Sequence, residues 1–328
     1  MLLLMNSCSE TSSPGLEWLG DEVAVRFTTT MQPSVEILPL TRAEGTKGMI
    51  EGETLPEGEK VGIYGIRTKA GAEVPAWKDA TFHRQMKNKQ YLVEENHTLS
   101  PAYGEVDYYP FMDSVLTVYA YAPYTTDKVD ADGYLSVKLS EQIDYLVTGD
   151  PVTGGQVIYK DRDADEVVQP LTFRHAMGAV AFRFYTDEVE LKETVIESII
   201  LTLNYNHTTL KLSLADGTFQ GDFSNEEGYA YQIFFEDGTT VNYPSGPTAI
   251  TPIAPTMLVP GDEFKITQLI LYYYQEDGRE SKTLDTSITV EAGKTTVLNI
   301  KCQQKAEGTT PQLIVDKTGN ASSELPPL

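Results

Sequence analysis

The chain has 328 residues, of which 41% are hydrophobic and 22% are charged, so collagen, coiled coils and bulk disorder are excluded. Its formal net charge is −23, because 48 acidic residues outnumber 25 basic ones, and such a surface repels nucleic acid. Two cysteines and four histidines, scattered along the sequence, cannot form a zinc cluster, and no apolar run reaches the roughly 20 residues of a membrane helix.

The first residues predict a lipid anchor. Met1 to Met5 is apolar, but it is too short for a complete secretory signal, and no basic residue precedes Arg26. We interpret residues 1–20 as the remnant of a lipoprotein signal followed by a linker, with the true start codon upstream. The apolar run followed by Ser7 and Cys8 resembles a bacterial lipobox, in which Cys8 receives the lipid and anchors the protein in the outer membrane. The alternative is that Cys8 is an ordinary free thiol near a frayed terminus.

The first predicted strand covers residues 22–29. Val23, Val25 and Phe27 fall on one side of it, and polar or small residues fall on the other. This period of two is typical of a half-buried strand. The hydrophobic core is therefore expected to begin here.

Most of the remaining chain shows the same alternation, punctuated by Gly, Pro, Asn and Asp. It predicts strands at residues 60–66, 114–122, 134–139, 179–185, 198–203, 209–214, 229–235, 264–274, 287–290 and 295–302. A short helix is expected only at residues 80–89 or at the turn 175–178. The sequence therefore predicts an all-β fold made of sandwiches.

A charged stretch divides the chain. Residues 160–166 lack large apolar side chains and precede Pro170, which predicts a domain boundary near residue 165. An N-terminal β-sandwich over residues 21–165 and a C-terminal one over residues 166–302 would each have enough residues to fold independently. Residues 303–328 form a C-terminal tail, in which Leu313, Ile314 and Val315 are expected to make a short strand.

Three aspartates in this stretch match the opening of a calcium loop. Asp161, Asp163 and Asp165 alternate as calcium ligands do. However, Glu166 stands where the loop needs glycine, and Thr172 stands where a glutamate should close the coordination shell. We therefore interpret the stretch as a solvated linker and expect no metal.

No motif indicates an enzyme. The sequence contains no nucleophile elbow, no zinc-protease helix and no phosphate-binding glycine loop. His175 has no cysteine or acidic partner nearby in the sequence, so we expect a structural, hydrogen-bonded histidine rather than a catalytic base. No cofactor is expected either.

Tyrosines crowd residues 108–124 and 272–274, so a sugar-stacking surface is one interpretation. In the strand at 115–122, however, Tyr119 and Tyr121 alternate with Val118 and Ala120. This alternation favours tyrosines that pack against a sheet with their hydroxyl groups at its rim.

The order of several short motifs resembles the fimbrillin family of Bacteroidetes type V pilus subunits. The motifs follow the lipobox-like cysteine along nearly the whole chain, at residues 41–43, 55–64, 108–110, 118–124, 144–146, 171–176, 257–260 and 288–294. Two departures are Val147-Thr148, which replaces a small residue of the family pattern, and the missing tryptophan in the tyrosine-proline segment.

This resemblance implies two tandem transthyretin-like β-sandwich domains, exported as a lipoprotein precursor and then built into a fimbrium on the cell surface. A trypsin-like processing protease would cut after Arg42, and the strand with Val23, Val25 and Phe27 would be displaced. A neighbouring subunit would replace it by donor-strand exchange, with Leu313, Ile314 and Val315 as the candidate donor strand. The alternative for Arg42 is that it is an ordinary arginine of an exposed loop.

Three functions remain open at this point. The first is a pilus subunit, in the shaft or at the tip, that adheres to a host or bacterial surface receptor and has other pilus subunits as partners. The second is a surface lipoprotein that binds glycans without polymerising. The third, a surface glycosidase, would need two carboxylates at catalytic separation in a cleft.

Overall fold

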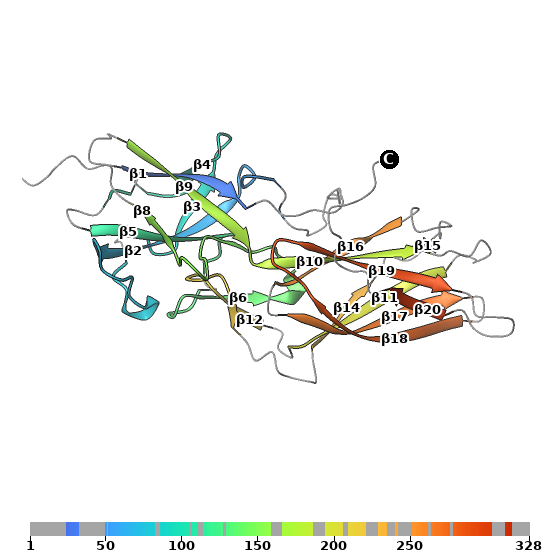
Figure 1. The fold of residues 1–328 in the computed structure, drawn as a ribbon. Coiled ribbons are helices and arrows are strands. Elements are labelled where there is room, and N and C mark those ends of the chain that lie inside the picture. The colour runs from blue at the N-terminus through green and yellow to red at the C-terminus, as the bar shows by residue number, and fades with distance from the viewer. Residues whose placement is uncertain are drawn as a thin grey trace, which may run out of the picture.

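The structure is a computed structural model, and it describes residues 24–32, 50, 52–82, 86–104, 107–109, 114–126, 129–158, 166–185, 194–205, 209–220, 229–234, 240–241, 251–261, 264–275, 278–303 and 312–316. These residues are nearly all in strands, as the sequence predicts. Figure 1 shows an elongated molecule, with the N-terminal strands at one end and most of the C-terminal strands at the other.

The N-terminal half is a sheet that closes on itself. Its strands are β1 (Ala24–Met31), β2 (Lys60–Lys69), β3 (Lys89–Val93), β4 (Thr98–Pro101), β5 (Ser114–Ala122), β7 (Leu146–Val147), β8 (Gln156–Ile158) and β9 (Glu166–His175). They are ordered β2-β3-β4-β1-β9-β7-β5-β8, and β2 also pairs with β5. The pairings therefore form a closed ring of β2, β3, β4, β1, β9, β7 and β5, with β8 beside it.

The inward-facing side chains of these strands form one core. It includes Phe27 from β1, Ile63 from β2, Tyr91 from β3, Val118 from β5 and Phe173 from β9, all with 1% or less of their surface exposed. Strands that are distant in sequence thus meet around a common interior. We call this set of buried residues the ring core.

Strand β5 is buried on both faces. Val118 and Ala120 point into the ring core, whereas Tyr119 and Tyr121 belong to a second core shared with the C-terminal half. The Tyr121 hydroxyl donates a hydrogen bond of 2.8 Å to the Asn88 side-chain oxygen. The predicted alternation is confirmed, and because Tyr119 and Tyr121 are buried, their rings are not open to a sugar.

The C-terminal half contains two further sheets. The first is ordered β16 (Thr251–Pro260), β10 (Met177–Tyr185), β19 (Thr295–Gln303) and β20 (Gln312–Asp316). The second is ordered β14 (Tyr229–Phe234), β11 (Thr194–Leu203), β17 (Lys265–Gln275) and β18 (Gly278–Thr289), with β15 (Thr240–Val241) also paired to β11. Phe182, Leu201 and Leu271 are buried in the second core with Tyr119 and Tyr121.

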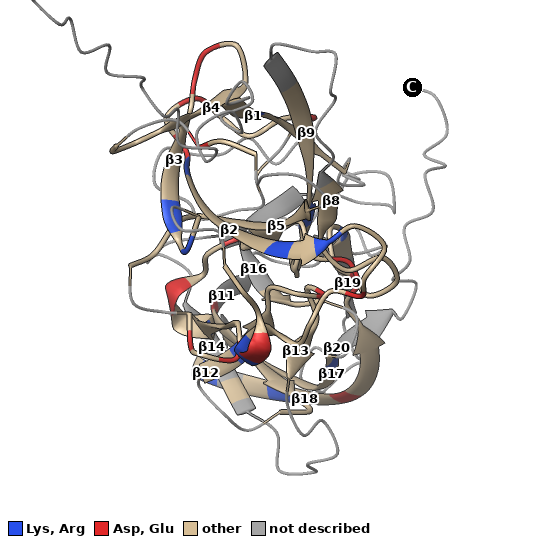
Figure 2. Cartoon of the chain, turned by 90° about the vertical axis from the view of Figure 1, so that its left-hand side faces the viewer, with Lys and Arg blue, Asp and Glu red and all other residues tan. Residues whose placement is uncertain are grey.

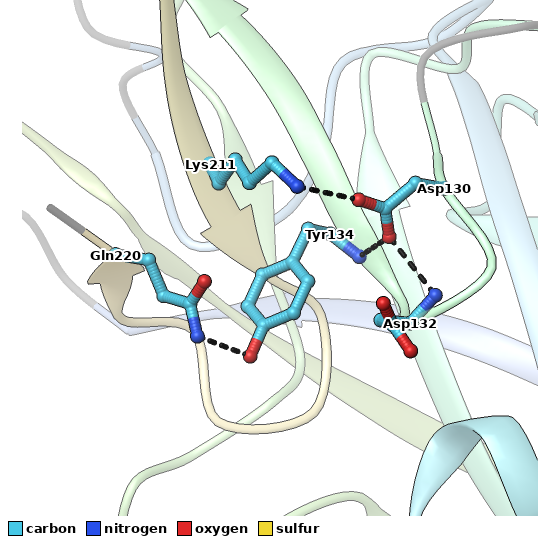
Figure 3. A network of polar contacts seen from close by, with 5 residues as sticks. All are labelled: Asp130, Asp132, Tyr134, Lys211 and Gln220. Atoms are coloured by element: carbon cyan, nitrogen blue, oxygen red, sulfur yellow. Dashed lines mark hydrogen bonds and ion pairs between the residues drawn. The ribbon is translucent and has the colours of Figure 1, made fainter.

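A small third sheet joins the two halves. Strand β6 (Tyr134–Lys138) pairs along its whole length with β12 (Thr209–Ser213), and β12 also pairs with β13 (Phe219–Gln220). Figure 3 shows the polar contacts at this junction, where Lys211 Nζ lies 3.0 Å from the Asp130 carboxylate and Gln220 donates to the Tyr134 hydroxyl. We call this junction the interdomain sheet.

Most predicted strands are present, but neither place at which a short helix is expected is helical in the described residues: 175–178 lies at the junction of β9 and β10, and 80–82 and 86–89 are not helical. At residues 80–89, Phe82 forms an antiparallel bridge with Ile66, and Lys89 begins β3. The described helices are the 3₁₀ turns Trp77–Asp79 and Leu139–Glu141. No helix among the described residues is long and apolar enough to cross a membrane.

The change from the N-terminal ring to the C-terminal sheets lies after the charged stretch, not within it. Strand β9 follows the expected boundary near residue 165, yet it pairs with β1 and β7 in the ring. The chain leaves the ring at Ala176, and β10 begins at Met177. The domain limits and the transthyretin-like topology stay predictions.

Candidate functional site

Strand β1 completes the ring between β4 and β9. It runs parallel to β9 over its whole length, from Ala24 opposite Glu166 to Met31 opposite Phe173. On its other side it pairs antiparallel with β4 at Phe27 and Thr28. Figure 2 shows β3, β4, β1 and β9 in this order along the ring. Without β1, both β4 and β9 would become edge strands.

Alternate side chains of β1 point into the ring core. Val25, Phe27, Thr29 and Met31 are each at most 5% exposed, whereas Arg26 lies at the surface. The Phe27 and Tyr91 rings meet edge to face, with centroids 5.9 Å apart. Burying an apolar side chain contributes roughly 1.5–3 kcal/mol, so β1 supplies a substantial part of the stability of the ring.

Backbone hydrogen bonds hold β1 at both ends. The Val25 N–H donates to the Asp107 carbonyl at 2.7 Å, and the Met31 N–H donates to the Glu53 carbonyl at 2.7 Å. The chain continues to Gln32, whose N–H donates to the Phe173 carbonyl at 2.8 Å. Each of these bonds would have to be replaced if β1 left.

A buried carboxylate lies beside the start of β1. Asp107 is fully buried and accepts hydrogen bonds from the Tyr91 hydroxyl and from Lys89 Nζ, the latter at 2.9 Å. Burial, together with the charge of Asp107, raises the pKa of Tyr91 far above its ordinary value. The phenol therefore stays protonated and acts as a donor. The packing of Phe27 on Tyr91 connects β1 to this polar group.

A second buried polar group joins two of the sequence motifs. His175 Nδ1 lies 2.9 Å from Asp144 Oδ2, and both side chains are 2% exposed. The same carboxylate oxygen accepts a hydrogen bond of 2.8 Å from the Ile50 N–H. His175 is therefore buried and hydrogen-bonded, and its structural role stays a prediction. Sequence reasoning missed its partner because Asp144 lies 31 residues earlier.

The remaining predicted site residues are distributed as follows. Val25 and Phe27 face the ring core, as expected, whereas Val23, Cys8 and Arg42 lie outside the described residues. Leu313, Ile314 and Val315 lie in β20, where they pair antiparallel with Cys302, Lys301 and Ile300 of β19. The structure thus does not bring the candidate donor strand next to β1 of the same molecule.

No cation site is found in the described part of the chain, where no three His, Cys, Asp or Glu side chains form a group that could hold a metal ion. Asp161, Asp163 and Asp165 lie outside the described residues. The arrangement at β1 is suited to binding a peptide strand rather than a metal ion. It is a position for one extended strand, lined by apolar side chains and by the backbone groups of two neighbouring strands.

Several solved structures resemble this one, including two from Bacteroides species. A "putative cell adhesion protein" from Bacteroides ovatus is 13% identical, with a TM-score of 0.55 over 90% of this chain and 96% of that chain. A "putative cell adhesion protein" from Bacteroides uniformis is 16% identical, with a TM-score of 0.50 over 90% of this chain and 97% of that chain. At these identities the likeness concerns the fold.

No curated protein matches the sequence. A family model does match it, under the description "Fimbrillin-like", from residue 41 to residue 317. This match covers most of the chain, including the ring from β2 onward and every sheet of the C-terminal half. Together with the all-β fold, it shows that the chain belongs to the fimbrillin-like family.

Proposed function

We propose that this chain is a pilus subunit in which β1 is a provisional strand, replaced after proteolysis by a strand of another subunit. The observation that carries this proposal is the place of β1 in the ring, between β4 and β9, with four side chains in the core. The family comprises structural fimbrial subunits rather than enzymes, which is consistent with a role at the cell surface.

The segment that connects β1 to the rest of the chain contains a candidate cleavage site, which favours the exchange of β1. Arg42 lies in the sequence between Gln32 and Ile50, so a cut after Arg42 would leave β1 attached only by non-covalent contacts. The family match begins at residue 41, next to this arginine, and does not include β1. A trypsin-like protease is therefore the proposed trigger for assembly.

Loss of β1 would expose apolar side chains and leave backbone hydrogen-bonding groups unpaired, and a new strand could bury and pair them again. The apolar side chains Val25, Phe27 and Met31 would leave the ring core, at a cost of about 5–9 kcal/mol in buried surface. Backbone groups along β4 and β9 would lose their partners, and unpaired edges attract another strand. A donor strand would restore both contributions by β-augmentation.

The side chains of β1 define what a donor must supply. Its inward positions would follow the order of a branched aliphatic residue, an aromatic residue, a small residue and a long apolar residue, as in Val25, Phe27, Thr29 and Met31. The candidate donor is the segment with Leu313, Ile314 and Val315 of a second subunit. Because this segment pairs with β19 here, it would have to leave that strand before donating.

The proposal extends to the surface context. Cys8 would anchor the precursor to the outer membrane through a lipid, and the processed subunit would then join a fimbrium that adheres to a host or bacterial receptor. Other pilus subunits are the expected partners. This part is supported by family membership and by the lipobox-like sequence before Cys8.

Limited trypsin digestion tests the proposal. The purified chain would be digested, its new N-terminus mapped, and the product viewed by electron microscopy. We expect a cut after Arg42, release of β1, and ladders or filaments. Because trypsin cuts after lysine as well as arginine, Arg42→Ala combined with Lys47→Ala should prevent both the release of β1 and the assembly, whereas Lys47→Ala alone should prevent neither. A product that loses β1 and unfolds, or a cut that leaves β1 bound without any assembly, would contradict strand exchange.

A further inference from the structure

The buried Asp144–His175 pair fixes the point at which the chain enters the ring after the Arg42 segment. Asp144 precedes β7, and His175 ends β9. Ile50 reaches the same carboxylate oxygen through its backbone N–H, at 2.8 Å. Three segments that are far apart in the sequence therefore converge on one buried oxygen atom.

The hydrogen-bonding geometry assigns the roles within this group. Asp144 Oδ2 accepts the Ile50 N–H, and it lies 2.9 Å from His175 Nδ1. A carboxylate oxygen accepts hydrogen bonds, so we assign the hydrogen between the two groups to His175 Nδ1. The Ile50 N–H therefore binds to a carboxylate that is itself held in place by His175, and hydrogen bonds to charged acceptors are about twice as strong as neutral ones.

Ile50 has a second attachment, which is made by its side chain. Its side chain is 8% exposed and belongs to the ring core together with Val25, Phe27 and Met31. If β1 leaves, three members of that core leave with it. The bond to Asp144 involves no residue of β1, so the loss of β1 removes neither of its partners.

We propose that Asp144 is a positioning residue that holds the Ile50 backbone and thereby fixes where the chain enters the ring after the Arg42 segment. Its use during maturation rests on the proposed function, whereas the anchoring itself can be measured in the uncut chain. Asp144 holds the backbone of Ile50, and His175 orients the carboxylate. Residues from Gly52 onward then keep their path to β2 while the β1 position is empty.

Amide hydrogen exchange at single-residue resolution tests the anchoring in the full, uncut chain. In Asp144→Ala the Ile50 amide should lose protection by about tenfold or more, because its charged acceptor is gone. Asp144→Asn keeps an oxygen acceptor without the charge, so it should restore part of the protection. Asp107→Asn is the matched control, since it neutralises the other buried carboxylate of the ring without touching Ile50.

The outcomes separate the two proposals. Unchanged exchange of the Ile50 amide in Asp144→Ala, or an equal loss in Asp107→Asn, would overturn the anchoring role. If Asp144→Ala does not fold, as judged by circular dichroism, Asp144→Asn decides alone, with a several-fold loss at Ile50 expected. Trypsin treatment then follows: failure to release β1 from the wild-type chain would refute strand exchange and leave the exchange result at Ile50 intact.

Discussion

Phe27 and Tyr91 meet edge to face inside the ring, with an interplanar angle of 77°. Phe27 belongs to the first strand, whereas Tyr91 belongs to β3 and donates a hydrogen bond to buried Asp107. Through Tyr91, the apolar side chain of Phe27 is therefore connected to the buried carboxylate of Asp107. The contact also makes the Tyr91 ring a part of the surface that any strand in the β1 position must fit.

Replacing Phe27 by alanine should destabilise the uncut chain strongly. The change removes a fully buried ring, and such truncations cost about 3–5 kcal/mol. Denaturant unfolding followed by fluorescence measures the loss. Lys69→Ala, on the exposed end of β2, is the control and should change the free energy of unfolding by less than about 0.5 kcal/mol. Equal effects of the two variants would contradict the buried role of Phe27.

Tyr91→Phe should destabilise the ring by about 1–3 kcal/mol, because the buried Asp107 carboxylate loses a donor while the aromatic packing remains. Urea unfolding of the variant and of the wild-type chain gives the difference. Tyr103→Phe, at an exposed tyrosine, should be neutral and serves as the control. A neutral Tyr91→Phe would show that the hydroxyl does not support the carboxylate.

The raised pKa of Tyr91 also predicts a pH dependence. Burial and the nearby charge of Asp107 favour the neutral phenol in the folded state, whereas the phenol of the unfolded chain ionises near its ordinary pKa of 10.0. This contribution to stability is thus fully present below about pH 10 and is lost as the pH rises above it. Tyr91→Phe should show a smaller decrease in stability between pH 9 and pH 11, measured by urea unfolding.

Asp130 in the interdomain sheet should give the opposite pH trend. Burial alone would raise its pKa, but hydrogen bonds from the Tyr134 and Asp132 backbone and from Lys211 outweigh it and lower the pKa below 3.8. Its contribution is therefore present above about pH 4 and is lost as the pH falls through the folded pKa. Asp130→Asn should reduce the acid dependence of thermal unfolding, and an unchanged acid limb would contradict this.

Gly149→Ala should weaken the junction between the halves. A Cβ atom there would lie 2.3 Å from the Leu214 carbonyl oxygen, and backbone cannot move aside as a flexible side chain can. Overpacking of this kind costs about 1–3 kcal/mol. Gly71→Ala is a useful comparison, since its Cβ would meet no atom within 4 Å and only its φ of +79° opposes the change. Calorimetric melting temperatures should therefore fall more for Gly149→Ala.

The local pattern of the sequence was enough to predict most strands and the faces of β5, because alternation depends only on neighbouring residues. The pairing of β1 with β9 could not be predicted in this way, since the two strands are joined across more than 100 residues. Strand β16 was missed because prolines at 252, 255 and 260 indicate a loop, yet it pairs with β10 beside a register shift. The contact between Asp144 and His175 could not be predicted either, because the two residues are 31 positions apart in the sequence.

The double burial of β5 has a mechanical consequence. Val118 packs in the ring core and Tyr119 packs in the second core, so β5 contributes side chains to both. The interdomain sheet adds a second connection between the halves. A force applied along the subunit would therefore act on both hydrophobic cores through β5. A filament built from such subunits would resist bending within each subunit, because its two halves cannot move independently.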